Sequence, residues 1–402
     1  MALDMTTADA ILKELYPDDV LKNLTYQNHP FFAMVPKMEN FVGDAMVVPV
    51  TIGNPQGRSA TFATALANKG NSTVKKFVIT HAKDYMLCSV DNLTIITSQD
   101  KKGGFTDALK YENDNGIASL SHSLASSLFR NGGGSIGRVG AVSTTSLTLL
   151  DINDIVNFDV GMELTTSTTD GTSGSAYTGT ATVTDVDRNT GILTTDTNWA
   201  TQISSIAVND YIFVAGDFGA KLKGLAAWLP MTAPSATSFF SLDRTTDSSR
   251  LAGVRVLATE VAGLPLAEKL LFGAVKLARE GGSPDHCFVN YETFRDLEIE
   301  LRTGVQYSDV EVAGVGFSGI NLRGPKGTIK VIPDQDCPSN RAYMLTMSTW
   351  KLCSAGPAVQ ILDRDGRVSR EASSDAYETR MAFYGNLACN APGWNAVIDL
   401  TA

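Results

Sequence analysis

Hydrophobic and polar positions divide the chain into segments with different periods. Within residues 104–130, apolar side chains recur at intervals of three and four, at Ile117, Leu120, Leu124 and Leu128. That spacing places them on one face of a helix. The opposite face is small and polar, and it carries several serines and His122. The pattern predicts one long helix covered along one side, with His122 exposed to solvent or lying at an interface.

Residues 43–97 follow a strand pattern. The runs "DAMVVPVTI" and "VKKFVITHAKDYMLCSV" are rich in strand-forming residues, and a polar stretch rich in turn formers separates them. The connection is too long for a tight hairpin. An extended loop of this kind is either an arm that reaches a neighbouring molecule or a mobile loop.

The composition changes abruptly after residue 140. Residues 141–210 hold 17 threonines, no lysine and a single arginine, Arg188, and they carry −8 of the net charge of −10. Short β-prone runs alternate there with Asp, Asn and Gly turns. We expect a small all-β unit inserted into another domain.

The remainder of the chain mixes helix and strand signals. Residues 264–280 predict a helix that stops at Gly281-Gly282, and "CFVN" predicts a strand that leads into a helix capped by Asn290. Residues 377–400 predict two long strands interrupted at Pro392-Gly393. Residues 1–40 read as an extended arm with short helices.

Composition indicates a folded protein without a membrane span. Apolar residues make up 43% of the 402 residues and charged residues 19%. No apolar run approaches the ~20 residues of a membrane helix, and "MALDMTTADA" lacks the features of a signal peptide. We therefore expect folding in a cytoplasm. The acidic net charge makes the chain a poor candidate for wrapping phosphate backbones.

The cysteines do not indicate a disulfide framework or a metal site. The five are widely scattered and form no C-x-x-C pair. We expect them to be small buried hydrophobic residues.

No catalytic motif stands out. The four histidines are far apart in sequence, and the Asp285-His286 pair lacks an identifiable third partner. We therefore expect a protein that is not an enzyme and that has no cofactor.

Gly132, Gly133, Gly134 and Gly137 spell the G-x-G-x-x-G of a dinucleotide-binding loop. Such a loop follows a strand and opens a helix, whereas here a helix comes first and β-rich sequence follows. We interpret these glycines as a helix end and a hinge leading into the acidic segment.

A calcium loop is a weaker possibility within the acidic segment. Asp185, Asp187, Asn189 and Asp196 fall at positions one, three, five and twelve of such a loop. The glycine is displaced to Gly191, the last ligand is not Glu, and no helices flank the string. A plain β-hairpin is the favoured interpretation, and we expect no metal.

Two further features bear on interfaces. The stretch 362–380 alternates in charge and contains Arg364, Arg367 and Arg370. It is either a solvated turn or a segment that sets the register between neighbouring subunits. Trp228 and Trp394 are expected as core or subunit anchors.

The order of these parts resembles that of tailed-bacteriophage major capsid proteins with the Hong Kong 97-type fold. The resemblance rests on the arm, loop and long helix, and on phrases such as "KLKGLAAWLP", "CFVNYETFRDLE" and "GTIKVIPDQDCPSNRAYMLTMSTWKL". "ETRMAFYGNLACNAPGWNAVI" is similar to the closing pair of strands in the peripheral domain of such proteins.

The resemblance implies an α+β fold with five parts. They are an N-terminal arm (1–40), an extended loop with peripheral-domain strands (41–100), a spine helix (101–131), an inserted acidic Thr-rich β domain (132–218), and an axial domain with the remaining peripheral strands (219–402).

The resemblance also implies a function. Copies of the chain would form hexamers and pentamers of an icosahedral virion shell, assembled in the host cytoplasm around double-stranded DNA that is bound without sequence specificity. Separate scaffold, portal and decoration proteins are the expected partners. The candidate interface residues are Arg58, Lys75, Lys76, Arg364, Arg367, Arg370 and Trp394.

Two alternatives remain open at this point. An encapsulin-like nanocompartment shell shares the fold and differs in its cargo. A β-rich surface or tail adhesion protein belongs to a different class, and it predicts a secretion signal or β repeats, neither of which the sequence contains.

Overall fold

The computed structural model describes residues 29–98, 108–301, 308–312, 315–362, 369–371 and 374–401. Residues 1–28, which hold most of the predicted arm, and 99–107, at the start of the predicted spine helix, lie outside the described residues. The chain divides into two compact units. The described part of the first comes from Tyr85–Ser121 and Ile361–Met381, and the second comprises most of the remaining chain.

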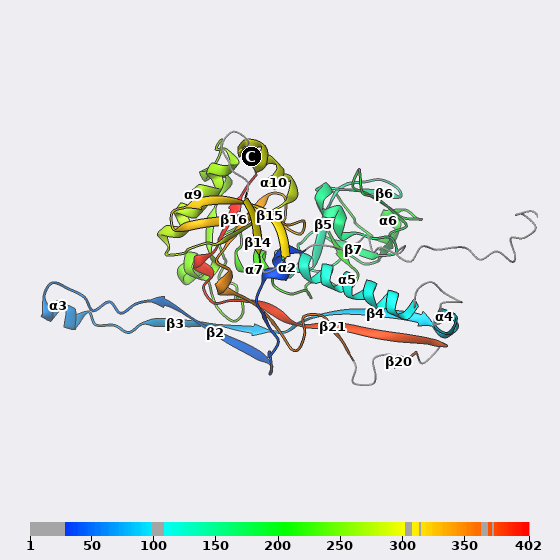
Figure 1. Cartoon of the computed structure of the whole chain (residues 1–402), viewed down its shortest axis with the longest axis horizontal. Helices are drawn as coiled ribbons and strands as arrows, with labels where there is room; N and C mark the ends of the chain where they lie inside the picture. Colours follow the sequence, from blue (N-terminus) through cyan, green and yellow to red (C-terminus); the bar gives the residue numbers. More distant parts are fainter. Residues whose placement is uncertain are drawn as a thin grey trace, which may run out of the picture. The chain divides into compact units, whose positions relative to one another are not determined.

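The first unit is built on strands β4 (Ala82–Asp91) and β21 (Ala376–Cys389) and on the first half of helix α5 (Ala108–Phe129), labelled in Figure 1. A Cβ atom on Gly116 of α5 would lie 2.5 Å from Cys88 Sγ and 3.2 Å from the end of Met381. Glycine at this position therefore lets the helix backbone approach both strands closely. Two shorter elements complete the unit, helix α4 (Asn92–Ser98) and strand β20 (Ser369–Arg370).

A seven-stranded mixed sheet organises the second unit. Its order is β12 (Val254–Val256), β22 (Ala396–Asp399), β17 (Arg341–Leu345), β13 (His286–Val289), β16 (Gly327–Pro333), β15 (Val315–Gly324) and β14 (Ser308–Val312). β12 pairs in parallel with β22, and β13 with β16, while the other pairs are antiparallel.

Strict alternation along these strands fills two separate cores. On β13, Cys287 and Val289 face one core and Phe288 faces the other. On β17, Met344 faces the same core as Cys287, and Tyr343 faces the same core as Phe288. The period of two arises because successive side chains of a strand point to opposite faces.

Helices α9 (Leu266–Arg279) and α10 (Tyr291–Leu301) pack against the core that contains Cys287 and Val289. They contribute Leu270, Leu277 and Leu297 to it. As expected, the backbone N–H of Glu292 donates to the Asn290 side chain at the start of α10. Gly281, with φ +96°, follows the end of α9.

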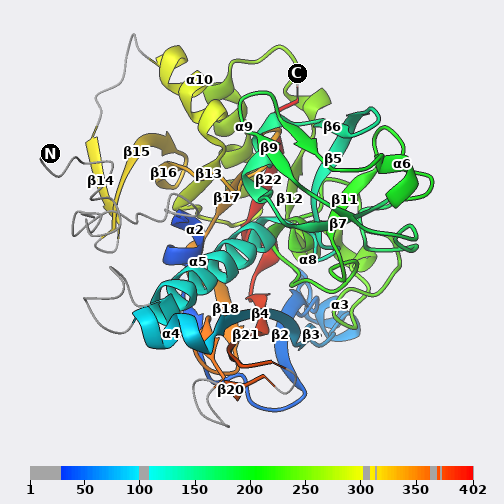
Figure 2. The same ribbon diagram turned by 90° about the vertical axis from the view of Figure 1, so that its right-hand side faces the viewer.

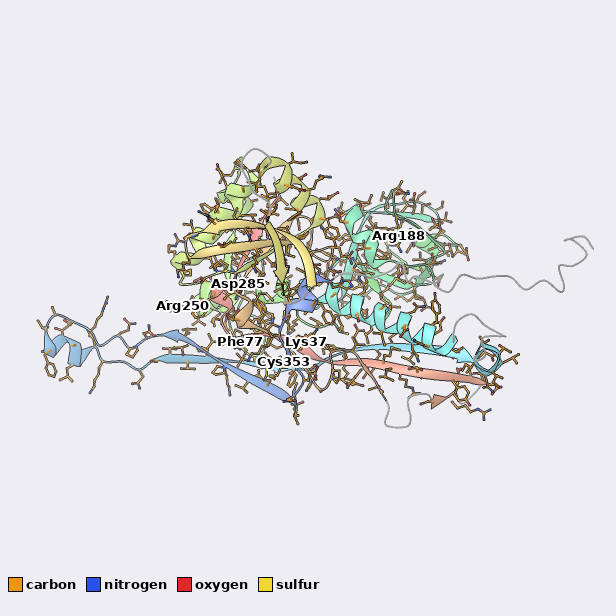
Figure 3. The ribbon with its side chains drawn as sticks, in the orientation of Figure 1. Lys37, Phe77, Arg188, Arg250, Asp285 and Cys353 are labelled. Atoms are coloured by element: carbon orange, nitrogen blue, oxygen red, sulfur yellow. The ribbon has the colours of Figure 1, made fainter. Side chains whose placement is uncertain are left out.

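The second core is aromatic. Trp228, in the short helix α7 (Leu225–Trp228), lies edge-on to Phe77, Phe239 and Trp350, with ring centroids 5.0, 5.1 and 6.3 Å away. Phe77 and Cys353 of this core are labelled in Figure 3. Trp228 is thus a core anchor, as its sequence context predicted.

Two further strands and a short helix join this core. Strand β18 (Trp350–Ser354) pairs antiparallel with the end of β21 and in parallel with β1 (Lys37–Met38). Helix α2 (Pro30–Met34) buries Phe31 in it.

The predicted closing strand pair is wrong. β21 pairs with β18, whereas β22 joins the seven-stranded sheet beside β17 and β12. Between them, Pro392–Trp394 forms a 3-10 turn, and the buried Asn395 side chain accepts hydrogen bonds from Thr346 N and Trp350 Nε1. These bonds hold the turn in the core, so that the chain passes from one sheet into another.

The long loop contains an antiparallel pair of strands, as predicted, but the second predicted strand is wrong in its length, because it ends at Thr80 and the following strand β4 pairs with β21 instead. Strand β2 (Ala45–Gly53) pairs with β3 (Thr73–Thr80), from Ala45 opposite Thr80 to Gly53 opposite Thr73. Helix α3 (Phe62–Ala67) lies at the far end of this hairpin (Figure 1).

Residues 132–218 contain a second seven-stranded sheet. Its order is β8 (Ala181–Thr182), β7 (Glu163–Ser167), β11 (Tyr211–Val214), β5 (Ser135–Val142), β6 (Ser146–Leu149), β10 (Ile192–Thr194) and β9 (Asp185–Asp187). Val139, Phe158, Leu164 and Trp199 belong to a core of its own. The segment is not purely β, because the 3-10 helix Ile152–Asn157 and helix α6 (Trp199–Gln202) lie among its strands (Figure 2).

Candidate functional site

The tip of the β2–β3 hairpin presents apolar side chains to solvent. Phe62 is 83% exposed and Leu66, one helical turn later, is 51% exposed. None of the six residues of α3 is buried. Because residues at i and i+4 share a helix face, these two side chains form an apolar patch, which we call the tip patch. We did not predict this patch from the sequence, although "TFATALA" carries the i, i+4 spacing.

Three predicted interface cations lie on the same hairpin. Arg58 and Lys76 are exposed, and Lys75 is half-buried on β3. Strand register places Lys76 opposite Pro49 and Lys75 opposite Val50. The hairpin therefore brings these cations onto the element that carries the tip patch.

The other predicted interface residues belong to other elements or lie outside the described residues. Trp394 lies on the turn before β22 and is 48% exposed. Arg370 is on β20 and pairs with Asp375 at 3.3 Å. Both side chains of that pair are largely exposed, so it resembles an ordinary surface ion pair. Arg364 and Arg367 lie outside the described residues.

The glycine run connects a helix to a strand, as predicted. α5 ends at Phe129 and β5 begins at Ser135, which is the reverse of a dinucleotide-binding loop. Gly132 and Gly134 have φ +87°. A Cβ on Gly133 would lie 1.9 Å from the carbonyl oxygen of Asp170. Glycine therefore allows two backbone segments to pack closely at this position. That the run, including Gly137, acts as a hinge stays a prediction.

The favoured hairpin interpretation of residues 185–196 is confirmed. β9 and β10 pair from Asp185 opposite Thr194 to Asp187 opposite Ile192. The Asp187 carboxylate accepts hydrogen bonds from Asn189 N and Thr190 Oγ1. These bonds close the turn between β9 and β10, as in an Asx turn, so the carboxylate stabilises the hairpin. Asp185 and Asp196 join no metal-like cluster among the described residues.

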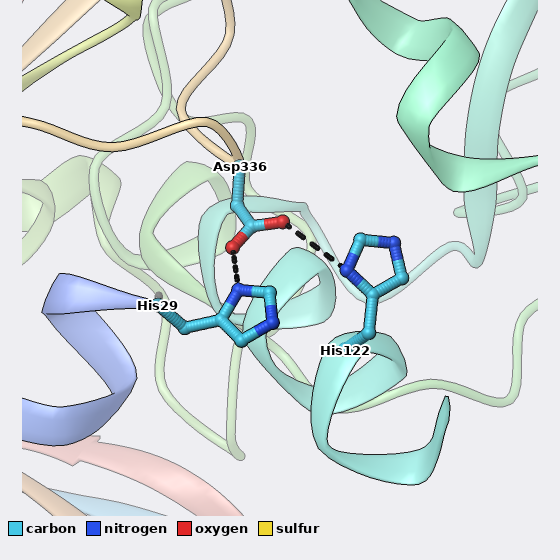
Figure 4. Close-up of side chains that lie close together, drawn as sticks. All are labelled: His29, His122 and Asp336. Carbon is cyan, nitrogen blue, oxygen red and sulfur yellow. Dashed lines mark hydrogen bonds and ion pairs between the residues drawn. The ribbon is translucent and has the colours of Figure 1, made fainter. Parts of the chain in front are cut away.

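Two histidines distant in sequence meet at a buried carboxylate. His29 precedes α2, His122 lies on α5, and Asp336 lies on the loop after β16. His29 Nδ1 is 2.6 Å from Asp336 Oδ2, and His122 Nδ1 is 3.8 Å from Asp336 Oδ1. Figure 4 shows the carboxylate between the two rings, with one oxygen toward each. We call these three residues the histidine cluster.

The prediction that His122 is exposed or at an interface is wrong for the chain described here. Its side chain is only 8% exposed, and that of Asp336 is fully buried. The helix pattern failed to show this because serines flank His122, and Ser126 and Ser127 are buried as well. A small polar face can pack closely against neighbouring segments, so it is not a reliable sign of solvent.

Burial and the neighbouring Asp336 together shift the pKa values of the two histidines. Burial lowers the pKa of His122 to about 4. For His29, burial also lowers the pKa, but the hydrogen bond and the charge of Asp336 outweigh it and raise the pKa overall. Nearby, burial and then the charge of Asp336 raise the pKa of Asp334 to about 7. Asp334 accepts hydrogen bonds from Phe31 N and Asp336 N, both at 3.0 Å, and so fixes the loop that carries Asp336.

Lys221 forms a second polar network. Its Nζ lies 2.8 Å from Asp84 Oδ1 and 3.0 Å from Asp217 Oδ2, and it donates to Ser123 Oγ at 3.1 Å. Ser123 Oγ in turn donates to Asp84 Oδ2 at 2.7 Å. Burial lowers the pKa of Lys221, but its two carboxylate partners outweigh that effect and raise it overall.

The five cysteines are free and buried, as predicted. Burial raises the pKa of Cys287 and of Cys389 to about 12 and that of Cys353 to about 11. Thiols of this kind are poor nucleophiles. None of the helices in the described part of the chain is both long and apolar enough to cross a bilayer.

Comparison with solved structures identifies the class of fold. The chain matches a chain of the cyanophage A-1(L) capsid asymmetric unit with a TM-score of 0.58 and 13% identity over 95% of both chains. It matches the capsid of the native GTA particle with a TM-score of 0.54 and 9% identity over 100% of both. It matches the capsid of the empty GTA particle with a TM-score of 0.50 and 8% identity over 99% of this chain and 98% of the other.

The chain therefore has an α+β capsid-protein fold, which confirms the predicted resemblance to phage capsid proteins at the level of the fold. No family model and no curated protein matches it.

Proposed function

We propose that this chain is the major capsid protein of a tailed bacteriophage, and that it assembles as hexamers and pentamers into an icosahedral head around double-stranded DNA. The observation that carries the proposal is the near-complete coverage of capsid chains at matched length. A local likeness would leave parts of either chain unmatched. Fold alone does not establish function, so the surfaces have to support the same role.

The tip patch supports it. Phe62 and Leu66 lie at the end of the hairpin, and the described residues leave both side chains exposed. Exposing a large apolar side chain costs about 2 kcal/mol relative to burying it, and apolar patches of this kind mark interaction sites. We propose that the tip patch packs on an adjacent subunit, with Arg58, Lys75 and Lys76 of the same hairpin selecting acidic partners.

The remaining parts take the roles that their resemblance implies. Residues 1–40 act as an arm, 41–100 as loop and peripheral strands, 101–131 as spine helix, 132–218 as an inserted β domain and 219–402 as axial domain with peripheral strands. Arg364, Arg367, Arg370 and Trp394 are proposed as further subunit contacts.

The role proposed is structural, without catalysis. With a net charge of −10, the shell encloses DNA without binding it tightly, because tight binding needs clustered lysine and arginine. Separate scaffold, portal and decoration proteins complete the virion, which assembles in the host cytoplasm.

Electron microscopy tests the assembly. The full chain is expressed alone and together with its neighbouring genes, and the particles are imaged. Closed icosahedral shells are expected in at least one case, and a persistent monomer in both would overturn the proposal. Shells that contain a protein cargo and never DNA would indicate a nanocompartment, and binding to cell surfaces without shells would indicate an adhesion protein.

A paired variant tests the tip patch. Phe62→Ser with Leu66→Ser should reduce shell yield at least tenfold while leaving the melting temperature of the subunit unchanged, because neither side chain is buried within it. Val160→Ser, at a 64% exposed position in the β segment, is the control and should assemble normally. Normal yield from the double variant would show that the patch is not an interface.

A further inference from the structure

The histidine cluster has the composition and spacing of a metal site. His29, His122 and Asp336 each offer one ligand atom, and these atoms all lie within 4.8 Å of one another. Each residue comes from a different segment of the second unit. No other group of three His, Cys, Asp or Glu side chains is gathered as closely in the described part of the chain.

Two buried atoms of the cluster are not used by ordinary hydrogen bonds. Asp336 Oδ1 is buried, and among the described residues it has no hydrogen-bond donor. His29 Nε2 is also buried without a partner there, since the bond to Asp336 uses Nδ1. A buried carboxylate oxygen without a hydrogen-bond donor destabilises the fold, because its lost hydration is not replaced. A bound cation would satisfy Asp336 Oδ1, which lies beside two imidazole rings.

We propose that His29, His122 and Asp336 bind one divalent transition-metal ion of the zinc class. Imidazole nitrogen and carboxylate oxygen are ligands that zinc accepts, and three protein ligands leave a fourth position for water. Two ligands of a tetrahedral ion lie roughly 3.4 Å apart. The 3.8 Å between Asp336 Oδ1 and His122 Nδ1 therefore needs only a small adjustment. Calcium and magnesium prefer all-oxygen sites and fit less well.

The surroundings support the ligands. Asp334 holds the Asp336 loop through the bond from Asp336 N. Neighbours that orient ligands in this way are typical of metal sites.

A bound ion would tie together the start of α2, helix α5 and the loop after β16. Because the three ligands converge only in the folded chain, the ion would stabilise the folded state by mass action. This inference is independent of the proposed function, since it concerns one subunit and makes no use of assembly.

Metal content gives the direct test. Untagged full-length protein is stripped with EDTA, incubated with Zn²⁺, freed of excess ion and analysed by mass spectrometry for zinc per chain. We expect about one equivalent. A parallel sample with Co²⁺ should show the visible absorption of a tetrahedral cobalt site with nitrogen and oxygen ligands, which reports coordination without any mutation.

Variants locate the ion. His122→Gln and Asp336→Asn should lower the zinc content at least tenfold. His286→Gln is the control, because His286 pairs with Asp285 at 3.1 Å outside the cluster, and it should keep one equivalent. Less than about a tenth of an equivalent in the unmutated protein, with no cobalt absorption, would overturn the proposal, as would full zinc retention by both cluster variants.

Discussion

Replacing Lys221 by methionine should destabilise the subunit strongly. The ammonium group lies 2.8 Å from Asp84 and 3.0 Å from Asp217, and its side chain is 11% exposed. Methionine preserves most of the volume and removes the charge. The two carboxylates would then remain in a largely buried place without their cation.

The magnitude follows from the burial of the network. Removing one partner of a buried ion pair typically costs about 3–5 kcal/mol, because an unpaired charge is left in a poorly solvated place. The carboxylates of Asp84 and Asp217 retain some solvent contact, so we expect the lower end of that range. For a cooperative chain of 402 residues, about 3 kcal/mol corresponds to a fall in melting temperature of about 4 °C.

The loss should also depend on pH in a defined direction. Burial already raises the pKa of Asp217, and Lys221 opposes that rise. Without the lysine, the folded-state pKa of Asp217 rises further above its unfolded value. Such an acid is tolerated when protonated and destabilises the fold as pH rises through its folded pKa. The difference between variant and unmutated protein should therefore be largest near neutral pH and shrink toward pH 4.

Differential scanning calorimetry of unassembled subunits at several pH values measures both effects. Arg295→Met is the control, because Arg295 pairs with Asp296 in an exposed position and should lose about 1 °C or less. A change at Lys221 as small as at Arg295, and constant with pH, would refute the reasoning by showing that solvent already screens the network.

Three further outcomes follow from the packing. Gly133→Ala should destabilise the subunit markedly, because its Cβ would lie 1.9 Å from Asp170 O, whereas Gly70→Ala, with open space around it, should be neutral by the same melting assay. The five buried thiols should react with a chromogenic disulfide reagent only after denaturation, and fast labelling of the native chain would contradict their burial. Replacing residues 135–217 by a short Gly-Ser linker should leave a soluble remainder, because Gly219 N donates to Gly133 O at 2.8 Å and brings the segment's ends together. An insoluble product, or one that circular dichroism shows to be unfolded, would contradict the interpretation of this segment as an inserted domain.

Elements with a strong local pattern could be predicted from the sequence. The long helix, helices α9 and α10, the loop strands and the β-rich character of residues 141–210 all have period and turn signals in their own residues. The path of the last strands had no such signal. Whether β22 joins β21 or another sheet depends on Asn395, whose partners Thr346 and Trp350 lie more than 40 residues away.

The histidine cluster could not be predicted for the same reason. His29 and Asp336 are separated by 307 positions, and no short motif records their meeting. The burial of His122 likewise depends on segments outside its helix. A sequence pattern reports which face of an element is apolar, but it does not report which distant segments converge on its polar face.

The contrast between the central sheet and the hairpin bears on what the chain is built to do. Along β13 and β17 every apolar side chain enters one of two cores within the chain. Along the hairpin, Phe77 and Ile79 are buried near its base, while Val74, Phe62 and Leu66 toward the tip are exposed. A two-stranded ribbon gains little stability by itself, and its apolar tip adds nothing to the isolated subunit. Burial of these residues needs a further surface, and under the function proposed above an identical copy of the chain supplies that surface at the same place on every subunit.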